Sequence, residues 1–351
     1  MRSFLHDAGL SAPMPAPLVR ELARVERGRG REELYRMQAP QVLERLAAQS
    51  RFESITASSA IENIVVPPRR ARQLLGSPDA TFRDRSEREL AGYKDAVDHL
   101  LAAPPEALTP ERVRDLHRIL LRHTDDAHAG RLKHANNFVG NRHEDGRVEV
   151  VFRTVPAGAE TERQLAELVE RYEAAVADDV VHPLVLLAAL ILDFLSIHPF
   201  VDGNGRVARL LTTRELLRQG YGVARYVSLE QRIYDAQHSY YETLQASQRG
   251  WHEGRHDVWP WIGFLLRVIA DAYDDLELRV RAQQSPAGAT KEAQARDYIL
   301  HHGPATFRWP ELVAALPDIS QASLRNVLAA LKAEGSVRAG LGRSAVWQRR
   351  S

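Results

Sequence analysis

No cysteine occurs among the 351 residues of this chain, which excludes disulfide bonds, thiolate metal sites and cysteine nucleophiles. Lysine is nearly as scarce: only Lys94, Lys133, Lys291 and Lys332 are present, so 43 of the 47 basic residues are arginine. The formal net charge is only +1, so overall charge gives no attraction toward nucleic acid. Long hydrophobic runs are absent too, because the longest, 183–192, is too short to cross a bilayer.

The remaining composition is typical of a globular protein, with 44% hydrophobic and 26% charged residues. Glycine and proline (21 and 18 residues) are too few and too scattered for a collagen-like or low-complexity chain. No apolar stretch of signal-peptide length follows Arg2, and Pro13, Pro15 and Pro17 come soon after it. We therefore expect a cytoplasmic protein without a membrane segment.

Apolar residues recur at helical spacing through most of the chain. Residues 1–17 are expected to form an irregular arm. One helix has a clear start signal, because Thr109 is suited to the N-cap and Pro110 to the first helical position. The expected helices are 18–50, 52–64, 86–103, 109–122, 160–177, 183–197, 206–218, 228–247 and 257–283.

Helical spacing breaks between residues 130 and 158, where glycine and asparagine are frequent. Within this stretch Val148, Val150 and Phe152 alternate with their neighbours, which predicts a short strand or hairpin. A glycine-rich loop is expected at 199–205. The fold class that follows is mostly α, a helical bundle with a short β-hairpin.

The last 60 residues have a different pattern. Residues 284–291 are expected to be a linker, followed by helices at 292–302, 309–315 and 320–334 and by a β-hairpin with glycines at its turns. This order predicts a winged helix-turn-helix with 320–334 as the recognition helix. From residue 320 onward, six Arg or Lys stand against the single acid Glu334. DNA binding through 292–351 and protein contacts are both left open.

The segment from His198 to Arg209, HPFVDGNGRVAR, carries the strongest chemical signal. An apolar helix ends at His198, and Gly-Asn-Gly then opens another helix, whose free N–H groups form an anion site. Arg206 and Arg209 are one turn apart on that helix and suit a polyphosphate. Asp202 is an oxygen ligand suited to Mg²⁺, and His198 can accept the proton of a hydroxyl. Together these residues predict transfer of a phosphorus group from a nucleotide to a hydroxyl.

Simpler interpretations of this segment are a turn with a structural histidine, or part of an EF-hand. The EF-hand fails because the twelfth position of such a loop would be Thr213, where a glutamate is required. The turn fails to explain why so many specified residues occur together. His301, His302, His252 and His256 are not expected to bind metal, because no third ligand is evident.

The segment resembles the Fic family (filamentation induced by cAMP), whose signature H-x-F-x-[DE]-G-N-G-R-x-x-R is matched at every fixed position. The resemblance extends over roughly residues 40–275 and includes ELAGYKDA at 89–96, Leu116-His117 and Gly130-Arg131. Proteins of this kind are mostly AMP transferases, which move adenylate from ATP to a Ser, Thr or Tyr hydroxyl of a target protein and release pyrophosphate. On this basis we expect a helical N-terminal region at 1–85, a catalytic domain at 86–283, the linker, and a winged-helix domain at 292–351.

The resemblance implies a division of roles within the loop. His198 would be the general base on the target hydroxyl, and Asp202 would hold Mg²⁺. Arg206 would contact the nucleotide phosphates, and Arg209 the γ-phosphate. The α- and β-phosphates would be cradled by the backbone of Gly203, Asn204 and Gly205.

Other residues are implied around the nucleotide. Phe200 would be a core anchor, with a packing role only. Tyr240 and Tyr241 would lie near the adenine, although ordinary helix packing explains the pair equally well. Gln248 stands where the family carries an asparagine that contacts the nucleotide.

A second family motif, [ST]-x-x-x-E-[GN], matches Ser58, Glu62 and Asn63. Ser58 and Glu62 are four residues apart and therefore share one helix face. In the family this glutamate pairs with the second arginine of the signature, here Arg209, so that ATP cannot bind in the productive pose. The resemblance therefore implies an auto-inhibited enzyme that carries its inhibitory helix, around 52–64, in the same chain.

The hairpin region 138–156 corresponds to the family's flap, which docks a segment of the target protein by main-chain pairing. It is longer here, with 141–147 inserted. The leading function is thus an auto-inhibited protein AMP transferase that uses ATP and Mg²⁺. Removal of AMP by the same site, and a nucleotide-sensing DNA-binding regulator, are the alternatives, and a homodimer is left open.

Overall fold

Helices dominate the computed structural model, as expected, and two small antiparallel sheets complete it. The structure describes residues 2–4, 10, 13–77, 81–102, 106–142, 147–283, 291–339 and 346–349. The helices that precede the C-terminal unit are α1 (Ala16–Gln38), α2 (Pro40–Ile61), α3 (Pro68–Gly76), α4 (Arg85–Ala102), α5 (Pro110–Leu120), α6 (Ala159–Asp178), α7 (Pro183–Ile197), α8 (Asn204–Arg218), α9 (Val223–Tyr226), α10 (Leu229–Asp235), α11 (Gln237–Gln248) and α12 (Trp259–Gln283).

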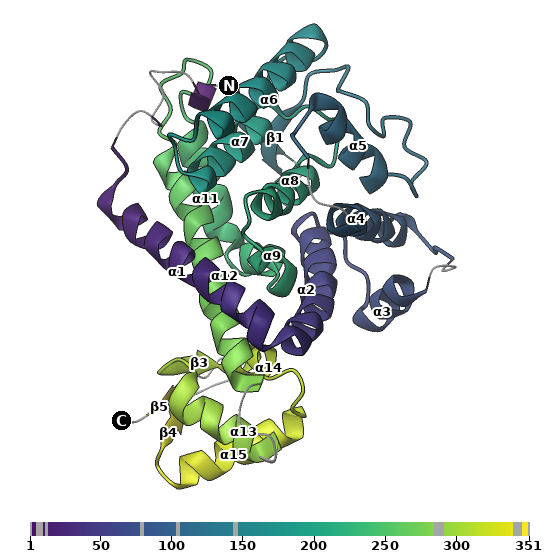
Figure 1. Ribbon diagram of the computed structural model, residues 1–351. Coiled ribbons are helices and arrows are strands. Elements are labelled where there is room, and N and C mark those ends of the chain that lie inside the picture. Colours follow the sequence, from purple (N-terminus) through teal and green to yellow (C-terminus); the bar gives the residue numbers. More distant parts are fainter. Residues whose placement is uncertain are drawn as a thin grey trace.

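Helix α7 forms the centre of the core, because every residue except Pro183 is buried. It packs against α6, α8, α11 and α12, and the long helix α12 also packs along α1 (Figure 1). Its start is defined by Pro183 in the first turn and by the His182 ring, whose Nδ1 accepts the N–H of Leu184 at 3.3 Å. A helix that is apolar on all sides can only be buried, which explains why the longest hydrophobic run of the sequence lies here. No helix in the described part of the chain could cross a membrane.

Several predicted helix boundaries are wrong. The expected helices 18–50 and 52–64 are divided instead at Ala39, because Pro40 starts α2, which then continues without a break to Ile61. The expected helix 228–247 is interrupted at Ala236, between α10 and α11. Helix α8 begins at Asn204, two residues earlier than predicted, because Gly203 takes the N-cap position. The short helices α3 and α9 were not predicted.

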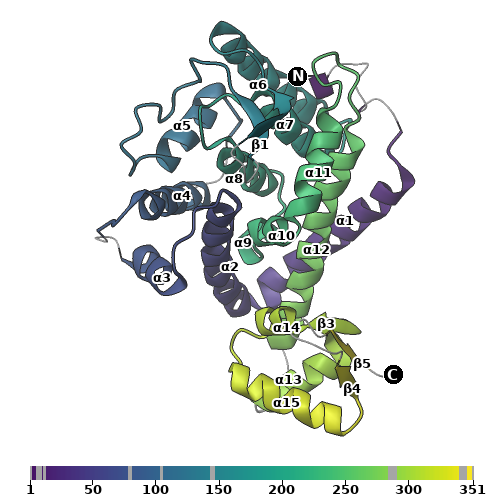
Figure 2. The same ribbon diagram turned by 180° about the vertical axis from the view of Figure 1, so that it is seen from behind.

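The predicted hairpin is confirmed as β1 (Phe138–Arg142) and β2 (Val148–Arg153), paired antiparallel, with an irregularity between Val139 and Gly140. Residues 143–146, in the middle of the expected insertion, lie outside the described residues. β2 contacts α11, and Figure 2 shows the hairpin at the end of the molecule opposite the C-terminal unit.

The N-terminal residues are more ordered than the expected irregular arm. Arg2–Phe4 form a 3-10 turn, η1, that packs against α7. The buried Ser3 hydroxyl donates to Asp193 Oδ1 at 2.6 Å and lies 3.0 Å from His256 Nε2. A short segment is therefore anchored in the core by polar contacts.

The C-terminal unit has its own hydrophobic core, to which the end of α12 contributes Ala282. Its elements are α13 (Lys291–Asp297), the π-helical turn η3 (Tyr298–His302), β3 (Thr306–Arg308), α14 (Trp309–Ala315), α15 (Gln321–Ala333), β4 (Val337–Ala339) and β5 (Val346–Arg349). The predicted helix 292–302 thus changes to a π-helical turn after Asp297, and β3 adds an unpredicted edge strand to the expected hairpin in the order β3-β5-β4. Linker residues 284–290 and the hairpin glycines Gly340 and Gly342 lie outside the described residues.

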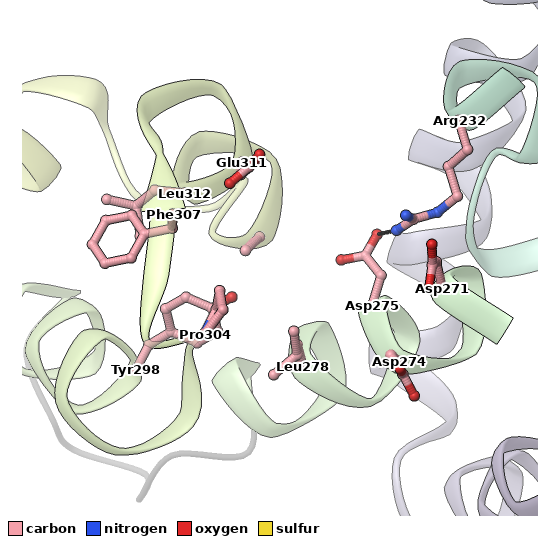
Figure 3. Close-up of a pocket in the computed structure, with 11 residues that line it drawn as sticks. Arg232, Asp271, Asp274, Asp275, Leu278, Tyr298, Pro304, Phe307, Glu311 and Leu312 are labelled. Atoms are coloured by element: carbon pink, nitrogen blue, oxygen red, sulfur yellow. Dashed lines mark ion pairs between the residues drawn. The ribbon is translucent and has the colours of Figure 1, made fainter. Parts of the chain in front are cut away.

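The C-terminal unit lies against the C-terminal end of α12 and near the start of α2 (Figure 1). On α2, Arg45 donates to Gln283 at 2.8 Å and lies 3.9 Å from Asp318. A pocket of about 210 Å³ separates the two parts, and Figure 3 shows that Leu278 of α12 faces Tyr298 and Pro304 across it. Its acidic residues already have partners: Asp271 and Asp274 bind Arg24, Asp275 binds Arg232, and Glu311 accepts the N–H of Arg308.

Candidate active site

His198 is the first residue after α7 and adopts a left-handed conformation, with φ 53° and ψ 62°. Such a conformation is unusual for a residue other than glycine and persists only where the surroundings fix it. The His198 Nδ1 lies 3.2 Å from the carbonyl oxygen of Leu195. A carbonyl can only accept, so Nδ1 carries the proton and Nε2 is left with a free lone pair. Burial lowers the pKa of His198 to about 4, so the ring is neutral at pH 7 and able to act as a base.

The loop after His198 is held by a buried amide. The Oδ1 of Asn204 accepts the Phe200 N–H and its Nδ2 donates to the Phe200 carbonyl, both at 2.9 Å. The Phe200 ring is buried and stacks on His117, with centroids 3.9 Å apart. The Asn204 side chain thus closes the loop, and its backbone N–H alone remains for a ligand. The predicted packing role of Phe200 is confirmed.

His117 was expected only to be part of the family resemblance, but its side chain also supports this loop. Its Nδ1 accepts the Gly130 N–H at 2.9 Å, and its Nε2–H donates to the Asp202 carbonyl at 3.1 Å. Burial lowers the pKa of His117 to about 4, which keeps the ring neutral and suits one accepting and one donating nitrogen. The ring therefore fixes the backbone that leads to Asp202.

The N-terminus of α8 faces a cavity of about 800 Å³. Gly203 adopts φ 79°, which a residue with a Cβ would resist, and this turn directs the first N–H groups of α8 into the cavity. His198, Asp202, Gly203, Asn204, Gly205 and Arg209 all line it, so the structure brings these predicted residues together. Arg206 does not line this cavity.

Arg206 is instead buried beside Glu89 of α4, with Nη1 2.6 Å from the carboxylate and Nη2 3.7 Å from Asp202. The Glu89 carboxylate also binds Arg85, which in turn lies 3.5 Å from Asp202. Glu89 belongs to the segment 89–96 that resembles the Fic family, but no sequence pattern indicated that it pairs with Arg206, 117 residues away. The pair fixes the guanidinium of Arg206 behind the loop.

Arg209 is the buried cation of the cavity and contacts the end of α2. Its Nε donates to the Ser58 hydroxyl at 2.7 Å and its Nη2 donates to the Ser58 carbonyl at 3.0 Å. Nη2 also donates to Glu62 Oε1 at 2.9 Å. The predicted juxtaposition of Ser58, Glu62 and Arg209 is therefore present, although Glu62 caps α2 rather than lying within it.

The Glu62 carboxylate reaches further, over the N-terminus of α8. A Cβ placed at Gly205 would collide with Glu62 Oε1, so the carboxylate lies directly against this residue. It thus lies between Arg209 and the N-terminus of α8, both of which favour anions. The next residue, Asn63, turns the chain away with φ 59°.

The far wall of the cavity comes from α11. Tyr240 is buried and packs edge-to-face against Trp261, with centroids 5.3 Å apart, whereas Tyr241 is 47% exposed. Gln248 is buried and its amide donates to Ser196 at 3.3 Å. All three predicted residues line the cavity, together with Val139 and Val151 of the hairpin.

Asp202 is the residue suited to a metal ion. Its side chain is 55% exposed, and one oxygen accepts the N–H of Gly203. No cluster of three or more His, Asp or Glu able to hold a metal occurs among the residues the structure describes. A single carboxylate beside an anion site fits Mg²⁺, which is commonly bound by one or two carboxylates together with substrate phosphates.

The fold and the loop are similar to those of known proteins. Residues 107–216 match the Fic/DOC family. A crystal structure of a Fic family protein from Desulfovibrio desulfuricans G20 superposes with a TM-score of 0.63 at 22% identity, covering 97% of each chain. A Fic domain containing signaling protein from Bacteroides thetaiotaomicron VPI-5482 gives 0.58 at 20% identity, covering 77% of this chain and 97% of that one. The fold is that of Fic proteins.

Curated relatives with similar sequences are named protein adenylyltransferase Fic. The protein from Nematostella vectensis is 25% identical over 239 residues, which cover 66% of this chain and 50% of that protein. The protein from Drosophila persimilis is 26% identical over 289 residues, covering 80% and 50% respectively. The chain therefore spans about half the length of these relatives.

Proposed function

We propose that this protein transfers AMP from ATP to a hydroxyl group of a protein. The observation that carries the proposal is that His198, whose Nδ1 faces the Leu195 carbonyl, lies in the same cavity as the α8 N-terminus and the buried Arg209. A base, an anion site and a buried cation are the parts that nucleotidyl transfer to a hydroxyl requires. The names of the curated relatives point to the same activity.

In the proposed reaction the target hydroxyl oxygen attacks the α-phosphorus of ATP. The new oxygen–phosphorus bond forms as the bond from the α-phosphorus to the bridging oxygen breaks, and pyrophosphate leaves. His198 Nε2 takes the hydroxyl proton, which its lowered pKa allows at neutral pH. The N–H groups at the start of α8 stabilise charge on the phosphate oxygens.

Asp202 would hold Mg²⁺ in this complex. The bound ion would neutralise part of the negative charge of the phosphates. The protein contributes the orientation of the carboxylate: the Gly203 N–H bonds one of its oxygens, and His117 fixes its backbone carbonyl.

The target is proposed to dock at the hairpin. β1 and β2 form a sheet of two strands, so a strand of the target can add to it by main-chain pairing. Phe138 and Val150 are exposed there and offer apolar contacts. Val139 and Val151 line the catalytic cavity, so a segment added at this sheet would lie beside His198.

We further propose that Glu62 inhibits the enzyme. Its carboxylate competes with the γ-phosphate for Arg209 and covers Gly205. Incubation of the wild type, Glu62→Gly and His198→Ala with α-labelled ATP, Mg²⁺ and a cell lysate tests both proposals. Labelled protein with Glu62→Gly and none with His198→Ala is the expected result. Loss of label from an AMP-modified protein, with no transfer, would instead support AMP removal by the same site.

A second function, DNA binding, is favoured by the exposed face of α15. Gln321, Arg325 and Asn326 are exposed on its first turns, while Leu324 and Leu328 face the core. These three side chains are the types that read base edges from a recognition helix. Gel shifts with mixed-sequence duplex DNA over a salt series test it. Arg325→Ala should weaken binding, whereas Arg296→Ala, which loses only a guanidinium paired with Glu334, should not. Absence of a shift at low salt would contradict it.

A further inference from the structure

Lys133 is a buried cation of the catalytic domain that neither the resemblance nor the proposed reaction uses. Only 1% of the residue is exposed, whereas long charged side chains normally keep their ends in water. Its ammonium donates three hydrogen bonds of 2.9 Å each, to Asn137 Oδ1, Thr154 Oγ1 and the Ile197 carbonyl. All three acceptors are neutral oxygens, so this cation is held by hydrogen bonds rather than by a carboxylate.

The positions of these acceptors are informative. Asn137 directly precedes β1 and Thr154 directly follows β2, so the ammonium joins the two ends of the hairpin. Ile197 is the last residue of α7, directly before His198. One side chain therefore connects both ends of the hairpin to the residue that precedes the proposed base.

Further bonds connect the same two parts on the other side of His198. The backbone N–H of Lys133 donates to the Pro199 carbonyl at 2.8 Å. The Asn137 amide donates to the Phe200 carbonyl at 2.9 Å, and the Thr154 hydroxyl is bonded to Asn137 in turn. The left-handed backbone of His198 is thus held from the hairpin side both before and after it.

This arrangement is costly. Burial lowers the pKa of Lys133 to about 8, which means that the site destabilises the charged form relative to water. An apolar side chain of similar length would avoid this cost, so the ammonium is not explained by stability alone. Three directed hydrogen bonds do provide geometry that an apolar side chain cannot, because apolar contacts have no preferred direction.

We propose that Lys133 is a positioning residue that fixes the hairpin to the catalytic loop, so that a segment docked on the hairpin stays in a constant position relative to His198. The effect on AMP transfer rests on the proposed function, whereas the connection between the hairpin and the loop does not. The two can therefore be tested separately.

The connection is tested by hydrogen–deuterium exchange on the full-length protein without nucleotide. Lys133→Met should speed exchange by about tenfold in the two hairpin strands, 138–142 and 148–153, and also in the loop at 198–203. This is the effect of losing roughly one charge-assisted hydrogen bond. Lys133→Arg should restore part of the protection, and Lys94→Met is the control, because Lys94 is paired with Asp98 on the surface of α4. Faster exchange throughout the chain, or in the hairpin without the loop, would overturn the proposal.

Thr154→Val provides a milder test should Lys133→Met fail to fold, because it removes the hydroxyl at the hairpin end and leaves the bond to Ile197. In the Glu62→Gly background, α-labelled ATP incubated with a lysate yields labelled protein, and free AMP where water replaces the hydroxyl. The ratio of the two products does not depend on how much enzyme is folded. Thr154→Val should lower this ratio about tenfold. An unchanged ratio would overturn the proposal, and absence of both products would refute the proposed function while leaving the exchange result valid.

Discussion

Replacing Glu62 by glycine should increase transfer of AMP, and the structure allows the effect to be estimated. The carboxylate is bonded to Arg209 at 2.9 Å and lies against Gly205, so it occupies the place of an anion. A hydrogen bond to a charged group contributes about 1.5–3 kcal/mol. Because Glu62 is 34% exposed, water screens the pair and the lower value applies. Removal of about 1.5 kcal/mol of competition corresponds to roughly a tenfold gain.

The assay is incorporation of label from α-labelled ATP at ATP concentrations below saturation, where competition is visible. Glu62→Gln, which keeps the volume but not the charge, should give an intermediate rate. Glu44→Gln makes the same chemical change at an exposed position of the same helix and should match the wild type. Glycine at 62 costs little helix stability, because the residue lies at the C-cap of α2.

Nucleotide affinity provides an independent check without turnover. In a His198→Ala background, calorimetry should show tighter ATP binding, by about tenfold, when Glu62 is also replaced by glycine. Equal affinities and equal transfer rates for Glu62→Gly and the wild type would refute the competition. A faster rate with unchanged affinity would mean that Glu62 acts on the alignment of the phosphates rather than on binding.

Three further predictions concern the loop. Transfer by the Glu62→Gly enzyme should be independent of pH from neutral down to about pH 5 and should fall only as the pH approaches about 4. The reason is that the general base must be neutral, and burial lowers the pKa of His198 to about 4. A decline that begins near pH 6.5 in a pH–rate profile would contradict this. Asp202→Asn should reduce transfer and raise the Mg²⁺ concentration needed for half-maximal rate, whereas an unchanged Mg²⁺ dependence would exclude it as the ligand. Glu89→Gln should lower the free energy of unfolding by about 3 kcal/mol in urea melts, because it leaves the Arg206 guanidinium buried without its carboxylate, and an unchanged midpoint would refute that role.

The sequence predicted those parts of the fold that leave a local pattern. The apolar run at 183–197, the Thr109 cap and the alternation at 148–153 each correspond to an observed element. Boundaries failed where one residue decided them: Pro40 starts a helix inside a stretch whose apolar spacing continues on both sides. The periodicity is the same before and after the break, so the pattern alone could not locate it.

The candidate site was predictable as a set of residues, because His198 to Arg209 are contiguous in the chain. The resemblance also predicted Ser58 and Glu62 as partners of Arg209, but two other partners were not predicted. Glu89 and Lys133 act on the loop from positions 117 and 64 residues away, and no short-range spacing relates them to it. Only the backbone of Asn204 was expected to contact phosphates, and its side chain closes its own loop, which satisfies both of its polar atoms.

The uninterrupted course of α2 has a mechanical consequence. Its 22 residues span about 33 Å. About 26 Å of that length separates Arg45, beside the C-terminal unit, from Glu62, whose carboxylate lies over α8. A helix is stiff along its axis, and no loop lies between these ends to absorb a displacement. A displacement of Arg45 along the helix axis would therefore also shift the Glu62 carboxylate at the other end.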